Sequence, residues 1–288
     1  MLVIGSENIM LNIIRLEQVD STNNYAQQHF AALPDRSLIT AQHQTKGKGR
    51  GGKTWISLCT SNLYTSYIMK NIPFLPCKAS WIGGLAALYT IREIIKQHTL
   101  KPLYSSKSHI DIKPQNLLPK AHNKNRLIDT DYWIKWPNDI YHKTKKISGI
   151  LCESSLGQNN QVNGVIIGIG MNINMSKQEL EKIDKPATSI LVETGTSTEI
   201  ESAINILIAN LNKLYDEISA GNIDSIFELW KKENALIGNS VEILLDNNVL
   251  DAKVLDIENS GQLVVVDKNA NIHKIYSGDV SIKNFCIP

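Results

Sequence analysis

Residues 45–55 read TKGKGRGGKTW, so four glycines and four Lys or Arg residues occupy the ten positions before Trp55. Each glycine costs about 0.5–1 kcal/mol relative to alanine inside a helix or strand, so this segment is predicted to be a loop. The segments on either side, SLITAQHQT (37–45) and SNLYTSYIMK (61–70), are typical of strands. The basic loop therefore joins two strands.

A loop of this composition has two interpretations. Composition alone favours a solvated basic segment of the kind found in nucleic-acid-binding tails. The alternative is an anion-binding loop, in which glycine lets backbone N–H groups approach phosphate oxygens while the cations neutralise them. The formal net charge of the chain is +2, which is close to balance and does not indicate a general affinity for nucleic acid.

The composition is that of an ordinary globular protein. The 288 residues leave room for two domains, and 42% hydrophobic with 20% charged residues predict a sizeable core. Cysteines at positions 59, 77, 152 and 286 form no C-x-x-C pair, so we expect neither a zinc site nor a disulfide framework, and we expect the reducing cytoplasm as the compartment. No apolar run reaches the roughly 18 residues that cross a bilayer, and no export signal precedes the first strand.

The rest of the chain reads as a mixed α/β region followed by an all-β one. A strand up to Val19 precedes a short helix with Ser21 or Thr22 at its N-cap, and a long apolar helix is predicted over 81–98. Residues 100–131 show no sustained period and are interpreted as a surface insertion.

Strands return in the middle of the chain. Two strands in a hairpin centred on 142–146 and a buried strand over 163–174 are predicted, followed by helices with capping boxes at Ser176 and Thr198. After a third helix, short strands separated by turn residues predict a barrel of about five strands. We therefore expect a first domain over 1–234 and a second over 235–288.

Five motifs, in this order, resemble those of biotin protein ligases. They are DSTN (20–23), QTKGKGRGGKTW (44–55), KWPND (135–139), KKISGILCE (145–153) and GIGMNIN (168–174), and GDVSIK (278–283) resembles the last strand of that family's C-terminal domain. The resemblance implies an α+β fold: a catalytic domain similar to class II aminoacyl-tRNA synthetases, with a mixed sheet and flanking helices, followed by an SH3-like β-barrel.

The resemblance also implies the reaction. Biotin and ATP, with Mg²⁺, would give biotinoyl-5′-AMP and pyrophosphate, and the biotin would then pass to one lysine of a biotin carboxyl carrier domain of acetyl-CoA carboxylase or a related carboxylase. About a dozen residues precede the first predicted strand, so we expect no DNA-binding domain and no DNA partner. We expect no membrane partner, and the chain is expected to be a monomer or a homodimer.

The catalytic residues implied by the resemblance are Arg50 and Lys146. A carboxylate that attacks the α-phosphorus of ATP brings two anions together, and fixed positive charge offsets the repulsion. The planar fork of Arg50 suits such oxygens, and Lys146 would approach them from its strand. An exposed turn lysine is the alternative, but it fits Lys143 or Lys145 better than a lysine that enters an apolar strand before Gly149. Asp139 is the candidate for a magnesium ion.

Further binding residues are implied in the same way. The biotin-binding set is Ser21, Thr22, Asn23, Gln44, Gly47, Lys48, Arg50, Lys146, Gly149, Gly168 and Gly170. The ATP-binding set is Arg50, Lys53, Trp55, Asn138 and Asn172. Without the resemblance, Ser21 and Thr22 are helix caps and Trp55 is a core residue.

The sequence departs from the family at three positions of the loop. The family usually has arginine where Lys48 and Lys53 stand, and a small or basic residue where Gly51 stands. Lysine keeps the charge but loses the bidentate fork. We expect weaker preorganisation of the loop and a higher KM for ATP.

The sequence leaves two other functions open. A lipoate ligase shares the family's fold, but KWPND and the arginine-containing glycine loop argue against it. A nucleic-acid-binding module would have a basic, aromatic-rich barrel. Residues 235–288 instead contain more carboxylates than lysines, and their aromatic residues are Tyr276 and Phe285. This composition argues against a nucleic-acid-binding module.

Overall fold

The computed structural model describes residues 12–58, 60–70, 72–104, 131–245 and 248–282. Most of the predicted insertion at 100–131 lies outside these residues. Within them, no helix has the length and apolar character needed to cross a bilayer.

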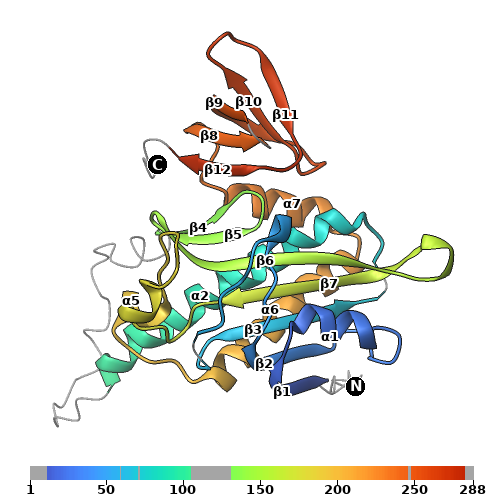
Figure 1. The fold of residues 1–288 in the computed structure, drawn as a ribbon, viewed down its shortest axis with the longest axis vertical. Helices are drawn as coiled ribbons and strands as arrows, with labels where there is room; N and C mark the ends of the chain where they lie inside the picture. Colours follow the sequence, from blue (N-terminus) through green and yellow to red (C-terminus); the bar gives the residue numbers. More distant parts are fainter. Residues whose placement is uncertain (1–11, 59, 71, 105–130, 246–247, 283–288) are drawn as a thin grey trace, which may run out of the picture.

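A seven-stranded mixed sheet forms the centre of the described fold, with the strand order β1-β2-β3-β7-β6-β5-β4 (Figure 1). β1 and β2 are parallel, and every other neighbouring pair is antiparallel. The strands are β1 (Ile13–Val19), β2 (Leu38–Gln44), β3 (Leu63–Met69), β4 (Tyr132–Lys135), β5 (Asp139–His142), β6 (Lys145–Leu156) and β7 (Val162–Met171).

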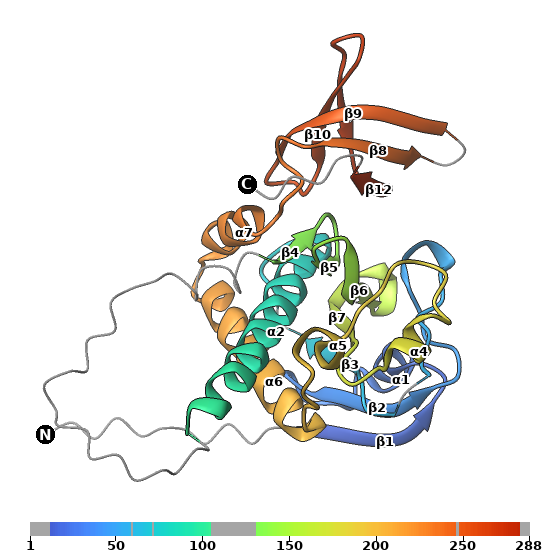
Figure 2. The same cartoon turned by 90° about the vertical axis from the view of Figure 1, so that its left-hand side faces the viewer.

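Helices cover both faces of this sheet because its strands are apolar on both sides. Leu38 and Ile167 pack into the large core with α2 and α6, whereas their neighbours Ile39 and Ile166 pack with Ala26 of α1 in a second, smaller core. Successive side chains of a strand point to opposite faces, so α1 lies on the face opposite α2 and α6 (Figure 2). The helices are α1 (Thr22–His29), α2 (Ala79–Tyr104), α4 (Lys177–Leu180), α5 (Ile190–Thr194), α6 (Ile200–Ser219) and α7 (Ile223–Lys232), and the 3₁₀ turns are η1 (Arg50–Gly52), η2 (Pro76–Lys78) and η4 (Gln158–Asn160).

A second, antiparallel sheet of five strands follows α7, in the order β11-β10-β9-β8-β12. In β8, Val241 and Ile243 are buried and join the large core, while Glu242 between them is exposed. The expected fold class is confirmed: a mixed α+β unit with a small C-terminal β unit of five strands. These strands are β8 (Ser240–Leu245), β9 (Asn248–Ile257), β10 (Leu263–Asp267), β11 (Ile272–Ile275) and β12 (Asp279–Ile282).

One of the two predicted capping boxes is wrong. Ser176 opens a capping box at α4, as predicted. The N-cap of α6 is Glu199 rather than Thr198, and it makes no side-chain cap hydrogen bond. The carboxylate of Glu201 accepts two hydrogen bonds from Arg15 of β1, at 3.0 and 2.7 Å, so a residue distant in the sequence engages the group that the capping box requires.

The region 131–154 also differs from the prediction, because it contains three strands rather than two. Pro137 has no N–H to donate to a neighbouring strand, and β4 ends at Lys135 while β5 begins at Asp139. β4 and β5 pair in a hairpin about this proline. The predicted 142–146 turn is present as well and joins β5 to β6.

Candidate active site

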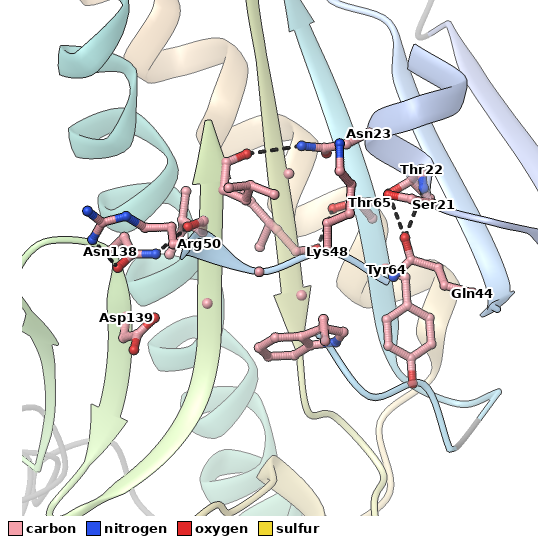
Figure 3. A pocket seen from close by; sticks show the side chains of 18 of the residues that line it. Ser21, Thr22, Asn23, Gln44, Lys48, Arg50, Tyr64, Thr65, Asn138 and Asp139 are labelled. Atoms are coloured by element: carbon pink, nitrogen blue, oxygen red, sulfur yellow. Dashed lines mark hydrogen bonds between the residues drawn. The ribbon is translucent and has the colours of Figure 1, made fainter. Parts of the chain in front are cut away.

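A cleft lies over β3, β6 and β7, between the first turn of α1 and the 45–55 loop (Figure 3). Its empty volume, including the open mouth, is about 450 Å³. The lining residues are Ser21, Thr22, Asn23, Gln44, Lys48, Gly49, Arg50, Trp55, Tyr64, Thr65, Asn138, Asp139, Lys146, Gly149, Ile150, Leu151, Gly168, Ile169 and Gly170.

Most of the residues singled out from the sequence meet in this cleft; Gly47, Lys53 and Asn172 do not line it. The lining residues that the sequence did not single out are Gly49, Tyr64, Thr65, Ile150, Leu151 and Ile169. A signal was present, because Gly49, Ile150, Leu151 and Ile169 lie inside the quoted motifs. Tyr64 and Thr65 lie on the strand that follows the basic loop.

Uncharged polar groups form one end of the cleft. The Oε1 atom of Gln44 accepts hydrogen bonds from the backbone N–H of Thr22 at 2.8 Å and from its hydroxyl at 3.2 Å. The hydroxyl of Ser66, on β3, contacts Thr22 Oγ1 at 2.8 Å. Ser21 occupies the N-cap position of α1, but its side chain makes no capping hydrogen bond. This end therefore presents fixed hydroxyl and amide groups with little net charge.

Glycines of two paired strands form the floor of the cleft. Gly149 of β6 lies opposite Gly170 of β7, and the indole of Trp55 covers both. A Cβ atom at Gly170 would lie 2.4 Å from Trp55 Cε2, and one at Gly149 would lie 2.9 Å from Cζ3. Trp55 Nε1 is buried without a hydrogen-bond partner among the described residues. Because Trp55 lines the cleft and is only partly buried, it suits a ligand-covering role better than a core role.

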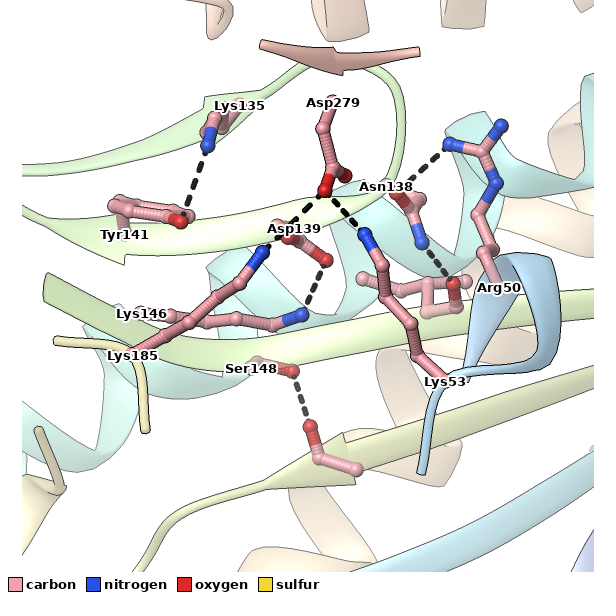
Figure 4. A network of polar contacts seen from close by, with 12 residues as sticks. Arg50, Lys53, Lys135, Asn138, Asp139, Tyr141, Lys146, Ser148, Lys185 and Asp279 are labelled. Atoms are coloured by element: carbon pink, nitrogen blue, oxygen red, sulfur yellow. Dashed lines mark hydrogen bonds and ion pairs between the residues drawn. The ribbon is translucent and has the colours of Figure 1, made fainter. Parts of the chain in front are cut away.

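Cations gather at the other end, where β5 meets β6 (Figure 4). Lys146 Nζ lies 2.7 Å from Asp139 Oδ1 and 5.5 Å from the centre of the Trp55 ring. Arg50 Nη1 donates to Asn138 Oδ1 at 3.1 Å, and the amide of Asn138 donates to the backbone carbonyl of Ile150. Burial lowers the pKa of Arg50, and the charge of Asp139 opposes that effect. Two cations from different segments therefore converge on the same end.

Two further cations next to this end form ion pairs with the C-terminal sheet. Lys53 and Lys185 both contact Asp279 Oδ2 of β12, and the distance from Lys185 Nζ is 3.3 Å. The hydrogen bond from Lys53 lowers the pKa of Asp279. The sequence did not single out Lys185, which has no local feature that distinguishes it from other surface lysines. Asp279 lies in the GDVSIK segment (278–283), but no role at the site was assigned to it.

A fourth lysine, Lys135, is mostly buried near the same end. Its Nζ lies 3.2 Å from Tyr141 Oη, and burial lowers its pKa. It thus adds positive charge behind Asp139 without lining the cleft.

The two remaining predicted residues have structural contacts. Asn172 is buried, and its amide donates to the backbone carbonyl of Thr188 at 3.0 Å. The carbonyl of Gly47 accepts from the N–H of Trp55 at 2.9 Å, and a Cβ atom on Gly47 would lie 2.4 Å from the Trp55 carbonyl oxygen. Gly47 therefore lets the loop fold back on itself.

A pre-formed metal centre is not found among the described residues, since no group of three His, Cys, Asp or Glu side chains is placed to hold an ion there. Asp139 is the carboxylate that lines the cleft. Mg²⁺ in nucleotide sites is commonly held by one or two carboxylates together with substrate phosphates. The donor set is therefore compatible with an ion that enters with a nucleotide.

Comparisons with known proteins agree with this geometry. The profile of the biotin/lipoate A/B protein ligase family matches residues 16–172, and that of the biotin protein ligase C-terminal domain matches residues 236–283. The chain is 28% identical over 251 residues to the bifunctional ligase/repressor BirA of Bacillus subtilis, covering 86% of this chain and 67% of that protein. It is 25% identical over 230 residues to the biotin–[acetyl-CoA-carboxylase] ligase of Paracoccus denitrificans, covering 78% and 82%.

A solved structure supports the fold. The biotin protein ligase from Aquifex aeolicus in complex with biotin and ATP aligns with a TM-score of 0.70 and 22% identity, over 95% of this chain and 99% of that one. At this identity, the likeness concerns the fold.

Proposed function

Because the chain belongs to the biotin/lipoate A/B protein ligase family, we propose that it is an ATP-dependent biotin protein ligase. It forms biotinoyl-5′-AMP from biotin and ATP and transfers the biotin to a lysine of a carrier protein. The observation that carries this proposal is one cleft with a neutral polar end, a glycine floor under an indole, and a cationic end.

The neutral end suits the ureido group of biotin, which offers two N–H donors and one carbonyl acceptor. Gln44 and the hydroxyls of Ser21 and Thr22 are the groups that would meet it, and all three residues are largely buried. A site built from such contacts rejects analogues that lack them by up to roughly 10⁴–10⁵. The dithiolane ring of lipoate has no N–H donors, so these residues favour biotin over lipoate.

The cationic end suits the first chemical step. An oxygen of the biotin carboxylate attacks the α-phosphorus of ATP, and the bond from that phosphorus to the pyrophosphate oxygen breaks. Lys146 and Arg50 would neutralise the charge that accumulates on the α-phosphate oxygens. This is the preorganised electrostatic stabilisation that commonly provides the largest catalytic effect.

The nucleotide would lie between the indole and the cations. Trp55 would cover the adenine, and Asn138 would contact the nucleotide beside Arg50. Lys53 and Asn172 remain proposed ATP contacts, although Lys53 would have to leave Asp279 to reach phosphate. Asp139 would hold Mg²⁺ together with substrate phosphates, and the ion, when bound, adds positive charge.

In the second step, the amine of the acceptor lysine attacks the carbonyl of the mixed anhydride and AMP leaves. We propose a biotin carboxyl carrier domain of acetyl-CoA carboxylase or a related carboxylase as the acceptor, and the cytoplasm as the location. We further propose that residues 1–234 form the catalytic domain and that residues 235–288 form a separate C-terminal domain.

The test is incubation of the protein with biotin, ATP, Mg²⁺ and a biotin carboxyl carrier domain, followed by mass spectrometry. We expect one carrier lysine to gain the mass of a biotinoyl group, with release of pyrophosphate. A parallel reaction with lipoate distinguishes the two branches of the family. Transfer of lipoate at least as efficient as transfer of biotin would overturn the proposal.

A further inference from the structure

Glu153 of β6 ends the KKISGILCE motif, but it is not among the residues assigned to biotin, ATP or catalysis. It makes two contacts inside the protein. Its Oε2 atom accepts a hydrogen bond from Asn23 Nδ2 at 2.7 Å, and its Oε1 atom lies 2.8 Å from Lys48 Nζ. Asn23 belongs to α1 and Lys48 to the basic loop, and both line the cleft. One carboxylate therefore joins two walls of the cleft that are distant in the sequence.

Both polar atoms of the Asn23 amide are engaged by the protein. Its Nδ2 group donates to Glu153 and to the carbonyl of Leu151 at 3.2 Å, and its Oδ1 atom accepts from the hydroxyl of Ser66 at 2.6 Å. The fit is tight, since a Cβ atom at Gly168 would lie 2.3 Å from Asn23 Oδ1. Asn23 is thus held as a rigid wall, and Glu153 is one of the groups that hold it.

Lys48 is held less firmly. Its side chain is 41% exposed, and that of Glu153 is 33% exposed, so the ion pair by itself contributes little to stability. The pair instead fixes position, because it ties the glycine-rich loop to the strand that also holds Asn23.

We infer that Glu153 is a positioning residue for biotin, which couples the basic loop to the head-group end of the cleft through Lys48 and Asn23. The inference rests on the proposed function, since it names what sets biotin affinity at that same site. A carboxylate is required for this role, because it offers two acceptor oxygens to two donors. Glutamine has the same shape, but its NH₂ group would face one of these donors.

The test compares Glu153→Gln with the wild type. We expect the KM for biotin to rise about tenfold, as for loss of a charge-assisted hydrogen bond, with kcat and the KM for ATP changed less than about twofold. Without ligands, we expect faster tryptic cleavage within residues 46–53, because Lys48 is no longer tied to the strand. Melting temperatures establish that each variant is folded.

The matched control is Glu258→Gln, which removes the charge of another Lys–Glu pair. Glu258 Oε1 lies 2.7 Å from Lys274 Nζ, with side-chain exposures of 37% and 55%. This variant should change neither the kinetic constants nor the cleavage.

Three results would overturn the inference. The first is a folded Glu153→Gln variant with the biotin KM and the cleavage rate of the wild type. The second is faster cleavage with an unchanged KM for biotin. The third is an equal rise of the KM for biotin and the KM for ATP, which would indicate a general structural role. If the wild type itself neither binds biotin nor forms the adenylate, the proposed function fails instead, and the cleavage rates still test the loop contact.

Discussion

Replacement of Lys146 by alanine should slow adenylate formation strongly while leaving the fold intact. Lys146 enters the cleft from β6, where its Nζ atom lies 2.7 Å from Asp139 Oδ1 and above the ring of Trp55. Its side chain is 30% exposed, so it is shielded from water but is not part of the core. Lys146 can therefore act on a bound phosphate. Its replacement should change the stability of the fold only slightly.

The magnitude follows from the geometry. Two unit charges about 4 Å apart interact by about 4 kcal/mol at the effective dielectric constant of a partly buried site. Removal of one preorganised group that stabilises developing charge commonly lowers kcat by about 10²–10³. Because Arg50 remains, we expect a loss near the lower end, about 100-fold. The ion pair with Asp139 is partly exposed, so the free energy of unfolding should fall by no more than about 1 kcal/mol.

Single-turnover release of pyrophosphate from ATP and biotin measures the rate, and urea unfolding measures the stability. The matched control is Lys145→Ala, which removes the same charge from the neighbouring, exposed position of β6, whose side chain points to the opposite side of the strand. The control should keep the wild-type rate. A folded Lys146→Ala variant that forms adenylate within about threefold of the wild-type rate would refute the assigned role.

Three further predictions concern other residues. Arg50→Gly should weaken retention of biotinoyl-5′-AMP, so serum albumin incubated with the variant, biotin and ATP should become biotinylated; pyrophosphate release without albumin labelling above wild type would show that Arg50 does not hold the adenylate. Gly170→Ala would place a methyl group 2.4 Å from Trp55 Cε2, so the indole must move, and the KM for ATP should rise about tenfold, the scale of moderate overpacking; an unchanged KM would contradict adenine binding against this indole. His142 is buried with its Nδ1 atom 3.0 Å from Glu193, and burial lowers its pKa below 6.5. The unfolded chain therefore binds the proton more tightly, and the free energy of unfolding should fall as the pH drops through about 6.5. Urea unfolding at about pH 7.5 and about pH 5.5 should show less of this loss in His142→Phe, and an equal loss in both proteins would refute the assignment.

Much of the fold was predictable because its signals are local. The alternation of buried and exposed residues in β8 and the glycine-rich composition of 45–55 depend on residues next to one another in the chain. Local signals failed where a distant residue competed, as when Arg15 engaged Glu201 and the predicted capping box at Thr198 did not form.

The sequence by itself determined most of the helices and strands, the order of the motifs, and the residue types that reach the cleft. The tertiary structure alone decided which of these residues meet. Lys48 contacts Glu153 from 105 positions away, and Lys53 contacts Asp279 from 226 positions away. The physical reason is that such contacts depend on strand register, which is set by the packing of the whole sheet, because a shift of one residue turns each side chain to the other face.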